Sequence, residues 1–485
     1  MKKLSILLMI AFGYMPVASS FAGGVTWYDQ GDPLSTLAEL PPSLSPEYLD
    51  PETGVACAGI NIQKTLSLAD IAEAALCNNP QTSEAYASAK VQAAQLGIAK
   101  SAYLPAVTDT VGVNSNVAIP SSSNIRGNPY SNLNNSIAAS YLLYDFGNRD
   151  ANLENARQLL QAASATQNAT VQNVLLSAIK AYYQVQADVA ALSAAQESEH
   201  FNQESFNAAD AKYKAGVSTP ADKLQAQTAF AQATLTRITA EGKLKTDNGI
   251  LANVMGLNAN TILKLASSKT QDIPKDIDKN IDKLIEQANL RRPDLIASEA
   301  QIEAAKANIK ASQAASKPTI SLNMSNNQQL GTDISGSNNT SLGVTVSIPL
   351  FTGYLNSYQI HAAEATEELR AAQRDQLRLQ ISLDVWTAYQ GLRTATETIK
   401  SAEALVASAK ESQRVALGRY KAGVGNIIDT LNAQSALANA NQQQIQAVLN
   451  WNIARSTLAQ SIGMLDNAMI QSLPDGKKTV QETQP

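Results

Sequence analysis

The hydrophobic positions of residues 354–440 follow the spacing of a long coiled-coil helix. Between Ile381 and Ala409 the apolar positions recur at alternating steps of four and three, which is the heptad seam of helices packed side by side. No proline interrupts residues 354–419, and at 1.5 Å per residue this segment predicts a rod of roughly 100 Å. Alone, such a rod is typical of a structural coiled coil. The predicted inward-facing residues are Ile381, Val385, Ala388, Leu392, Ala395, Ile399, Ala402, Val406 and Ala409.

The predicted rod ends at a glycine-containing turn, and the same arrangement occurs earlier in the chain. The run Tyr-Lys-Ala-Gly-Val begins at Tyr213 and again at Tyr420, and its glycine permits the left-handed backbone that ends a helix. A long helix is expected before the first turn, over residues 148–213. Shorter helices are expected after the two turns, over residues 219–256 and 426–463. The seam of the first long helix is predicted at Val171, Val174, Ala178, Tyr182, Val185, Val189 and Leu192.

Two other parts of the chain alternate between apolar and polar residues, which is the pattern of β-strands. Each part is predicted to form a hairpin, with polar loops at residues 120–135 and 326–339. The hairpin strands are about 10 to 13 residues long and have one apolar face, as outer-membrane strands do. The alternating apolar positions are Val107, Val111, Val113, Val117, Ile119, Ile137, Ala139, Tyr141, Leu143, Ile320, Leu322, Met324, Leu342, Val344, Val346 and Ile348.

Helices are expected ahead of each hairpin, and the whole order of elements occurs twice. Residues 66–103 are predicted to form one helix, and residues 281–290 and 293–316 to form two. Pro80 and Pro293 lie 213 positions apart, and the two Tyr-Lys-Ala-Gly-Val runs lie 207 positions apart. The chain is therefore a tandem duplication of helix, hairpin, long helix, turn and short helix. The predicted repeats span residues 65–256 and 281–465, with a connector at residues 257–280.

The N-terminus has the features of a secretory signal peptide, which we assign to residues 1–22. Lys2 and Lys3 precede a short apolar stretch, and Ser20-Phe21-Ala22 is a small-x-small cleavage site. No later stretch is long and apolar enough to predict a transmembrane helix. The other segments outside the repeats are an irregular N-terminal segment at residues 23–64 and a flexible tail at residues 466–485.

Composition narrows the functions that this exported chain of 485 residues can have. Its net charge of −5 and the lack of a basic run argue against a nucleic-acid partner. His200 and His361 lie in no recognisable acid–base or metal motif, and no Gly-x-x-x-x-Gly-Lys-Ser/Thr run is present. The sequence therefore predicts no enzyme, no metal and no cofactor. Cys57 and Cys77 are its two cysteines, and we predict a disulfide between them because exported proteins fold in an oxidising compartment.

The amphipathic hairpins, if they lie in lipid, require more than one copy of the chain. Lipid tolerates strands only in closed barrels, because an open edge leaves peptide groups without hydrogen bonds. Four strands are fewer than the eight of the smallest barrels, so several copies must share one barrel. The alternative is two surface hairpins on a soluble rod.

The order and spacing of these motifs resemble the TolC-like outer-membrane efflux and secretion proteins. The resemblance covers nearly all of residues 66–465, and the region around Leu76-Cys77-Asn78-Asn79-Pro80-Gln81-Thr82 looks closest to the branch serving type I protein secretion. The motifs that carry it are Asn78-Asn79-Pro80, Arg291-Arg292-Pro293-Asp294-Leu295, Ile348-Pro349-Leu350-Phe351 with Gly353, and both Tyr-Lys-Ala-Gly-Val turns.

The resemblance implies a mainly helical fold with a smaller β part and a homotrimer. Its twelve strands, four from each chain, would form one transmembrane β-barrel in outer-membrane lipid, and its helices would continue as a coiled-coil barrel into the periplasm. The two glycine turns would dock a periplasmic membrane-fusion adaptor, which joins the duct to an inner-membrane transporter of the ABC, RND or MFS type. The residues implied at these docking tips are Gly216, Val217, Gly423, Val424 and Gly425.

In this family acidic side chains often narrow the periplasmic entrance just beyond the second turn. Asp429 matches the acidic position, Asn432 stands three residues on, and Asp222 is the equivalent of Asp429 in the first repeat. Tyr420 matches a tyrosine that links neighbouring coils in a well-studied member, whereas Gly425 stands where that member has an arginine. Three copies of Asp429 are therefore expected to form a carboxylate ring. The alternative is that Asp429 is an ordinary solvated helix residue.

Two functions of different classes remain open at this point. The first is the passive outer-membrane duct of a tripartite efflux pump or a type I secretion system. The second is a secreted coiled-coil scaffold or adhesin without a pore. The sequence does not name a cargo for either of them.

Overall fold

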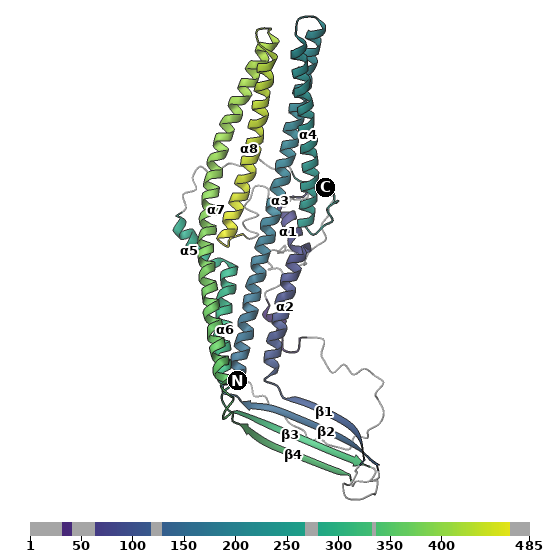
Figure 1. Ribbon diagram of the computed structural model, residues 1–485, viewed down its shortest axis with the longest axis vertical. Coiled ribbons are helices and arrows are strands. Elements are labelled where there is room, and N and C mark those ends of the chain that lie inside the picture. Colours follow the sequence, from purple (N-terminus) through teal and green to yellow (C-terminus); the bar gives the residue numbers. More distant parts are fainter. Residues whose placement is uncertain (1–31, 41–63, 118–128, 267–279, 332–335, 466–485) are drawn as a thin grey trace, which may run out of the picture.

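The computed structural model describes residues 32–40, 64–117, 129–266, 280–331 and 336–465. Figure 1 shows helices that run alongside one another from a β-sheet at one end to two helical turns at the other. The predicted signal peptide, Cys57, most of the predicted connector and the predicted tail lie outside the described residues. The described N-terminal stretch holds a short 3₁₀ helix, η1 (Leu37–Glu39), and Lys100 Nζ is 2.6 Å from the Glu39 carboxylate beside it.

The duplication predicted from the sequence appears as two sets of helices with equal lengths. Within the described residues, each set has helices of 11, 22, 67 and 35 residues in that order. The first set is α1 (Leu68–Asn78), α2 (Pro80–Ser101), α3 (Asn148–Lys214) and α4 (Pro220–Val254), and the second is α5 (Ile281–Arg291), α6 (Pro293–Ala314), α7 (Leu355–Lys421) and α8 (Ile427–Ser461).

The single helix predicted for residues 66–103 was wrong, because the chain breaks at Asn79. Asn79 has an extended backbone, and its side chain accepts a hydrogen bond from the Gln81 N–H to cap α2. Pro80 has no N–H to donate to the preceding turn and disfavours a helical residue before it, so it starts a new helix instead of continuing α1. The Asn79 side chain also donates to the Val254 carbonyl, which fixes this break against the end of α4.

The strands form one antiparallel sheet that the two repeats build together. In the described part of the chain its order is β1 (Ala106–Val117), β2 (Pro129–Tyr144), β3 (Thr319–Gly331) and β4 (Ser337–Ser347). β2 and β3, from different repeats, pair along most of their length, and β1 and β4 are the edges. The predicted loops at residues 120–135 and 326–339 were too long, because the strands continue through their polar residues. A side-chain hydrogen bond from Asn326 to Asn338 joins the two strands there.

The two long helices carry the core, largely on the faces that the heptads predicted. Of the predicted α7 positions all are buried except Val406, which is partly exposed. The α3 seam departs from its prediction after Val185, since Val189 is 48% exposed and Asp188 is buried in its place. α3 packs against α1, α2, α4, α6 and α8, whereas α7 packs against α5, α6 and α8. Each long helix is thus flanked by shorter ones.

Candidate channel entrance

The two helical turns lie at the end of the molecule opposite the sheet (Figure 1). Gly216 and Gly423 adopt positive φ values of 73° and 78°, and a Cβ atom at either position would meet open space. Val217 and Val424 follow them and are 73% and 70% exposed. The first turn joins α3 to α4 and the second joins α7 to α8, so each pair forms a helical hairpin. Each helical hairpin therefore ends in a small left-handed turn with one protruding apolar side chain.

Gly425 differs from Gly216 and Gly423 because a larger residue is excluded there by close contacts and not by a positive φ. A Cβ atom there would lie 2.9 Å from the Tyr420 backbone nitrogen and 3.0 Å from the Arg419 carbonyl carbon. A side chain at this position would therefore push the turn apart. The arginine that the family resemblance places here has no room in this hairpin.

Tyr420 is buried at the point where the two hairpins meet. Tyr420 is 9% exposed. Lys212 Nζ from α3 lies 3.7 Å from the centroid of the Tyr420 ring and 3.4 Å from the Tyr420 carbonyl oxygen. Burial, with a smaller contribution from the negative charge of Asp222, raises the pKa of the Tyr420 phenol. The phenol therefore stays neutral, and its ring presents an electron-rich face to the Lys212 ammonium.

Asp222 caps the first turn of α4. Its carboxylate accepts hydrogen bonds from the Thr219 N–H and the Ser218 hydroxyl, while its own N–H donates to the Thr219 side chain. Together these contacts form a capping box at the N-terminus of the helix, where negative charge is favoured. The Ser218 and Thr219 hydrogen bonds hold the pKa of the Asp222 carboxyl below its usual value.

Asp429 occupies the equivalent position on α8 but has a different environment. Asn426 caps this helix by accepting a hydrogen bond from the Ile428 N–H, so no capping box forms. Asp429 and Asn432 are both exposed, and Asp429 forms no hydrogen bond or ion pair with any described residue. Their spacing of three places them on one face of the helix. Asp429 is therefore available to solvent, whereas Asp222 is held by its own hairpin.

The structure thus gathers only some of the residues that the sequence suggested. Tyr420 and Asp222 are near enough to interact electrostatically, whereas Asp429, on the same α7–α8 hairpin as Tyr420, faces solvent. Lys212 was missed, although Lys212 and Arg419 hold the same place in the two repeats, one residue before each tyrosine. That repeated basic residue was a signal, but its contact across the hairpins depends on packing that the sequence does not show.

At the opposite end, the sheet exposes a row of branched apolar side chains. Val107, Val111 and Val113 of β1 are 62% to 74% exposed, and Leu342, Val344 and Val346 of β4 are 55% to 71% exposed. An apolar face on a sheet is normally covered by a protein core or by lipid. In the described residues no helix is long and apolar enough to cross a membrane.

Comparison with known proteins shows which family the chain belongs to. Residues 71–257 and 284–464 each match the family described as Outer membrane efflux protein. The chain belongs to the outer membrane efflux protein family. The two matches correspond to the two halves of the duplication, and the family is one of transport proteins.

Curated relatives and solved structures agree with this family. Protein CyaE of Bordetella pertussis is 27% identical over 413 residues, which cover 84% of this chain and 86% of CyaE. The outer membrane protein TolC of Vibrio cholerae is 23% identical over 435 residues, covering 86% of this chain and 95% of TolC. The crystal structure of the Campylobacter jejuni CmeC outer membrane channel matches the fold with a TM-score of 0.72 at 17% identity, covering 90% of this chain and 97% of CmeC.

This outer membrane efflux protein is an outer-membrane channel component with a long periplasmic helical part. The exposed apolar face of the sheet is the membrane end, and the two glycine turns mark the periplasmic end. The secreted scaffold without a pore, which the sequence left open, is set aside by family membership. The predicted disulfide stays a prediction, because no cysteine in the described residues is free but Cys57 lies outside them.

Proposed function

We propose that three copies of this chain form the passive duct of a tripartite efflux pump or a type I secretion system. Cargo would enter at the glycine turns and leave through a barrel of twelve strands. The energy would come from an inner-membrane transporter, reached through a periplasmic adaptor, so the duct itself needs no cofactor. The stretch from Leu76 to Pro80 and the similarity to CyaE favour the secretion branch.

The unpaired edge strands of the sheet are the main observation that supports a barrel shared by three copies. β1 and β4 have 12 and 11 residues, and neither has a second neighbouring strand among the described residues. Unpaired peptide groups along such edges are prohibitive in lipid. Pairing β4 of one copy with β1 of the next removes every edge when the ring closes. Three copies of a four-stranded sheet give a barrel size within the range of outer-membrane proteins.

The exposed apolar residues on the helices support the same assembly. Leu379, Leu383 and Trp386 follow one another at steps of four and three on α7, and they are 76%, 53% and 47% exposed. Leu235 and Ile238 on α4 are 57% and 53% exposed. Single exposed apolar residues are ordinary, but stripes at helical spacing mark interfaces. In the trimer these stripes would pack between neighbouring copies.

The residues of the entrance take roles that follow from their environments. Exposed Asp429, with Asn432 beside it, would line the opening as a ring of three carboxylates. Asp222 and Tyr420 would hold the closed arrangement of the hairpins, with Lys212 joining α3 to α7. Gly216, Val217, Gly423 and Val424 would form the surface for the adaptor, and Gly425 would fix the shape of the second turn.

Native mass spectrometry and planar-bilayer recording test the proposal together. Detergent-purified protein is expected to show three chains, and the same material is expected to form long-lived ion-conducting pores. Deleting the β1–β2 hairpin should abolish both, because the remaining strands leave new open edges. A monomer that inserts into bilayers and conducts would refute the shared barrel.

A further inference from the structure

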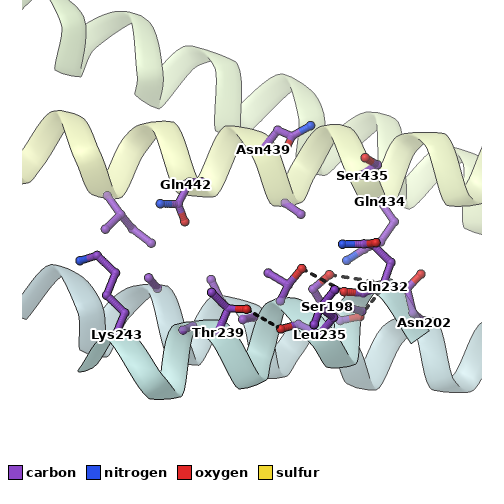
Figure 2. Close-up of a pocket in the computed structure, with 18 of the residues that line it drawn as sticks. Ser198, Asn202, Gln232, Leu235, Thr239, Lys243, Gln434, Ser435, Asn439 and Gln442 are labelled. Atoms are coloured by element: carbon purple, nitrogen blue, oxygen red, sulfur yellow. Dashed lines mark hydrogen bonds between the residues drawn. The ribbon is translucent and has the colours of Figure 1, made fainter. Parts of the chain in front are cut away.

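A groove lined by both apolar and polar side chains lies between the two repeats. It has a volume of about 740 Å³ and is lined by α3, α4 and α8. Figure 2 shows α8 on one side and the α3–α4 hairpin on the other, with labelled side chains from both sides facing the space between them. α3 contributes several small residues, among them Ala187, Ala191 and Ala195.

The groove has the dimensions of one extended chain. Its lining on α8 runs from Leu431 to Gln446, which is about 22 Å at 1.5 Å per residue. The volume divided by that length gives a mean cross-section of roughly 33 Å², which suits a narrow, elongated molecule. A compact ring system would fill only a part of this length.

One end of the groove presents a buried acceptor without a partner. Gln434 is 6% exposed, and its side-chain oxygen has no hydrogen-bond partner among the described residues. In Figure 2 its amide extends from α8 toward Gln232 and Asn202. Asn202 is also 6% exposed, and its amide donates to the Ser198 carbonyl. A buried acceptor left unpaired is costly, so this end favours a ligand that donates a hydrogen bond.

The other end carries more negative than positive charge. Asp188 is 4% exposed, and Lys243 Nζ lies 2.5 Å from its carboxylate and 2.9 Å from that of Asp247. Gln184 donates a further hydrogen bond to Asp188. Two carboxylates thus share one ammonium. Burial, together with the neighbouring Asp247 carboxyl, raises the pKa of Asp188, although the Lys243 ammonium acts in the opposite direction.

Between the two ends the walls are neutral. No charged residue occurs on α8 from position 431 to position 446, where the groove is lined by glutamine, asparagine, serine and apolar side chains. Alanine methyl groups offer contacts to a methylene chain, and amide oxygens accept hydrogen bonds from N–H groups. The lining therefore combines apolar contacts in the middle with acceptors at both ends.

We propose that this groove binds a linear polyamine, with one ammonium group at Asp188 and another at Gln434. The methylene segments would lie along the alanine floor of α3. A molecule held in this way bridges the first repeat, through α3 and α4, to the second repeat, through α8. The proposal concerns the groove alone, and it stands whether or not Asp429 forms the entrance ring.

Calorimetric titration of the detergent-purified full-length protein with spermine tests the proposal. One spermine per chain is expected. Putrescine is expected to bind at least tenfold more weakly, because a short diamine reaches only one end of the groove. Gln434→Leu and Asp188→Asn should each lower the affinity for spermine about tenfold or more, which is the usual effect of losing a hydrogen bond to a charged group. Gln443→Leu, the same change at an exposed α8 position outside the lining, should leave affinity unchanged.

Two further variants make the result decisive. Asp247→Asn should weaken binding as Asp188→Asn does, and thermal unfolding of each ligand-free variant shows whether the fold is kept. If Asp188→Asn unfolds, Asp247→Asn and Gln434→Met provide the same test. Asp429→Asn should bind spermine as the unchanged protein does. Loss of binding in Asp429→Asn alone, or equal affinity for spermine and putrescine, would overturn the assignment, as would the absence of binding.

Discussion

The Lys212 ammonium lies over the Tyr420 ring, 3.7 Å from its centroid, and joins the first hairpin to the second. The family resemblance places an arginine at position 425, on the second hairpin. Here Gly425 packs so closely on the backbone of Arg419 and Tyr420 that no side chain fits. The positive charge that contacts Tyr420 therefore comes from the neighbouring hairpin, and separating the hairpins must break this contact.

Lys212→Met should favour the open entrance. A cation–π contact contributes about 0.5 to 2 kcal/mol, so its loss should raise the opening equilibrium about twofold to thirtyfold. Tyr420→Leu should act in the same direction, whereas Tyr420→Phe keeps the ring and should behave like the unchanged protein. The open fraction in single-channel recordings measures the effect. Lys245→Met, at an exposed lysine of α4, is the control, and equal opening of Lys212→Met and the unchanged protein would contradict the role of Lys212.

Asp429→Ala should reduce the selectivity of the pore for cations. Three exposed carboxylates close to a narrow opening attract cations and repel anions, because low-dielectric walls focus their field. The variant should also lose block by multivalent cations added from the periplasmic side. Reversal potentials in asymmetric salt measure selectivity, and Asn432→Ala is the uncharged comparison on the same helix face. Unchanged selectivity and block in Asp429→Ala would remove Asp429 from the entrance.

Asp222→Asn should alter opening more than selectivity, and its effect should depend on pH. The pKa of Asp222 is lowered in the fold, so the ionised cap stabilises the protein above the unfolded pKa, and this stability is lost as pH falls through the folded pKa. The difference in thermal unfolding between the unchanged protein and Asp222→Asn should therefore be present at neutral pH and shrink in acid. A difference that stays constant down to acid pH would show that the carboxylate is not what stabilises this turn.

Bulky residues at both outer turns should stop export while the trimer stays assembled. Gly216→Leu combined with Gly423→Leu introduces side chains into open space, so the strain stays local to two left-handed turns. Export by intact cells and native mass spectrometry of the purified protein separate the two outcomes. Gly242→Leu, on an exposed part of α4, is the matched control. Normal export in the double variant would refute the docking role.

A disulfide between Cys57 and Cys77 should tie the N-terminal segment to α1. Cys77 lies near the end of α1, within the region of the main core cluster. Peptide mapping of non-reduced protein should recover a linked pair, and replacing either cysteine by serine should lower thermal stability. Free thiols in material isolated from the periplasmic side of the cell would contradict the prediction.

The periodic parts of this fold were predictable, and the parts set by contacts between repeats were not. The α7 heptads placed Ile381 and Ile399 in the core because a buried stripe needs apolar residues at fixed spacing. The loops between the strands were predicted too long, since serine and asparagine pair across strands without leaving an apolar signature. Asp188, and not the predicted Val189, is buried in the α3 seam because Lys243 of another helix compensates its charge. The contact of Lys212 with Tyr420 likewise depends on how one hairpin lies against the other.

The equal helix lengths of the two repeats restrict how this chain can change in length. α3 and α7 have 67 residues each, and α4 and α8 have 35 each, so both turns are the same number of helical steps from the sheet. One heptad added to α3 alone would raise its turn about 10 Å above that of α7 and separate Lys212 from Tyr420. Insertions into the long helices therefore have to come in matched pairs, one in each repeat. The strand connections, by contrast, can each vary alone, and the spacing between equivalent residues of the repeats drops from 213 to 206 across them.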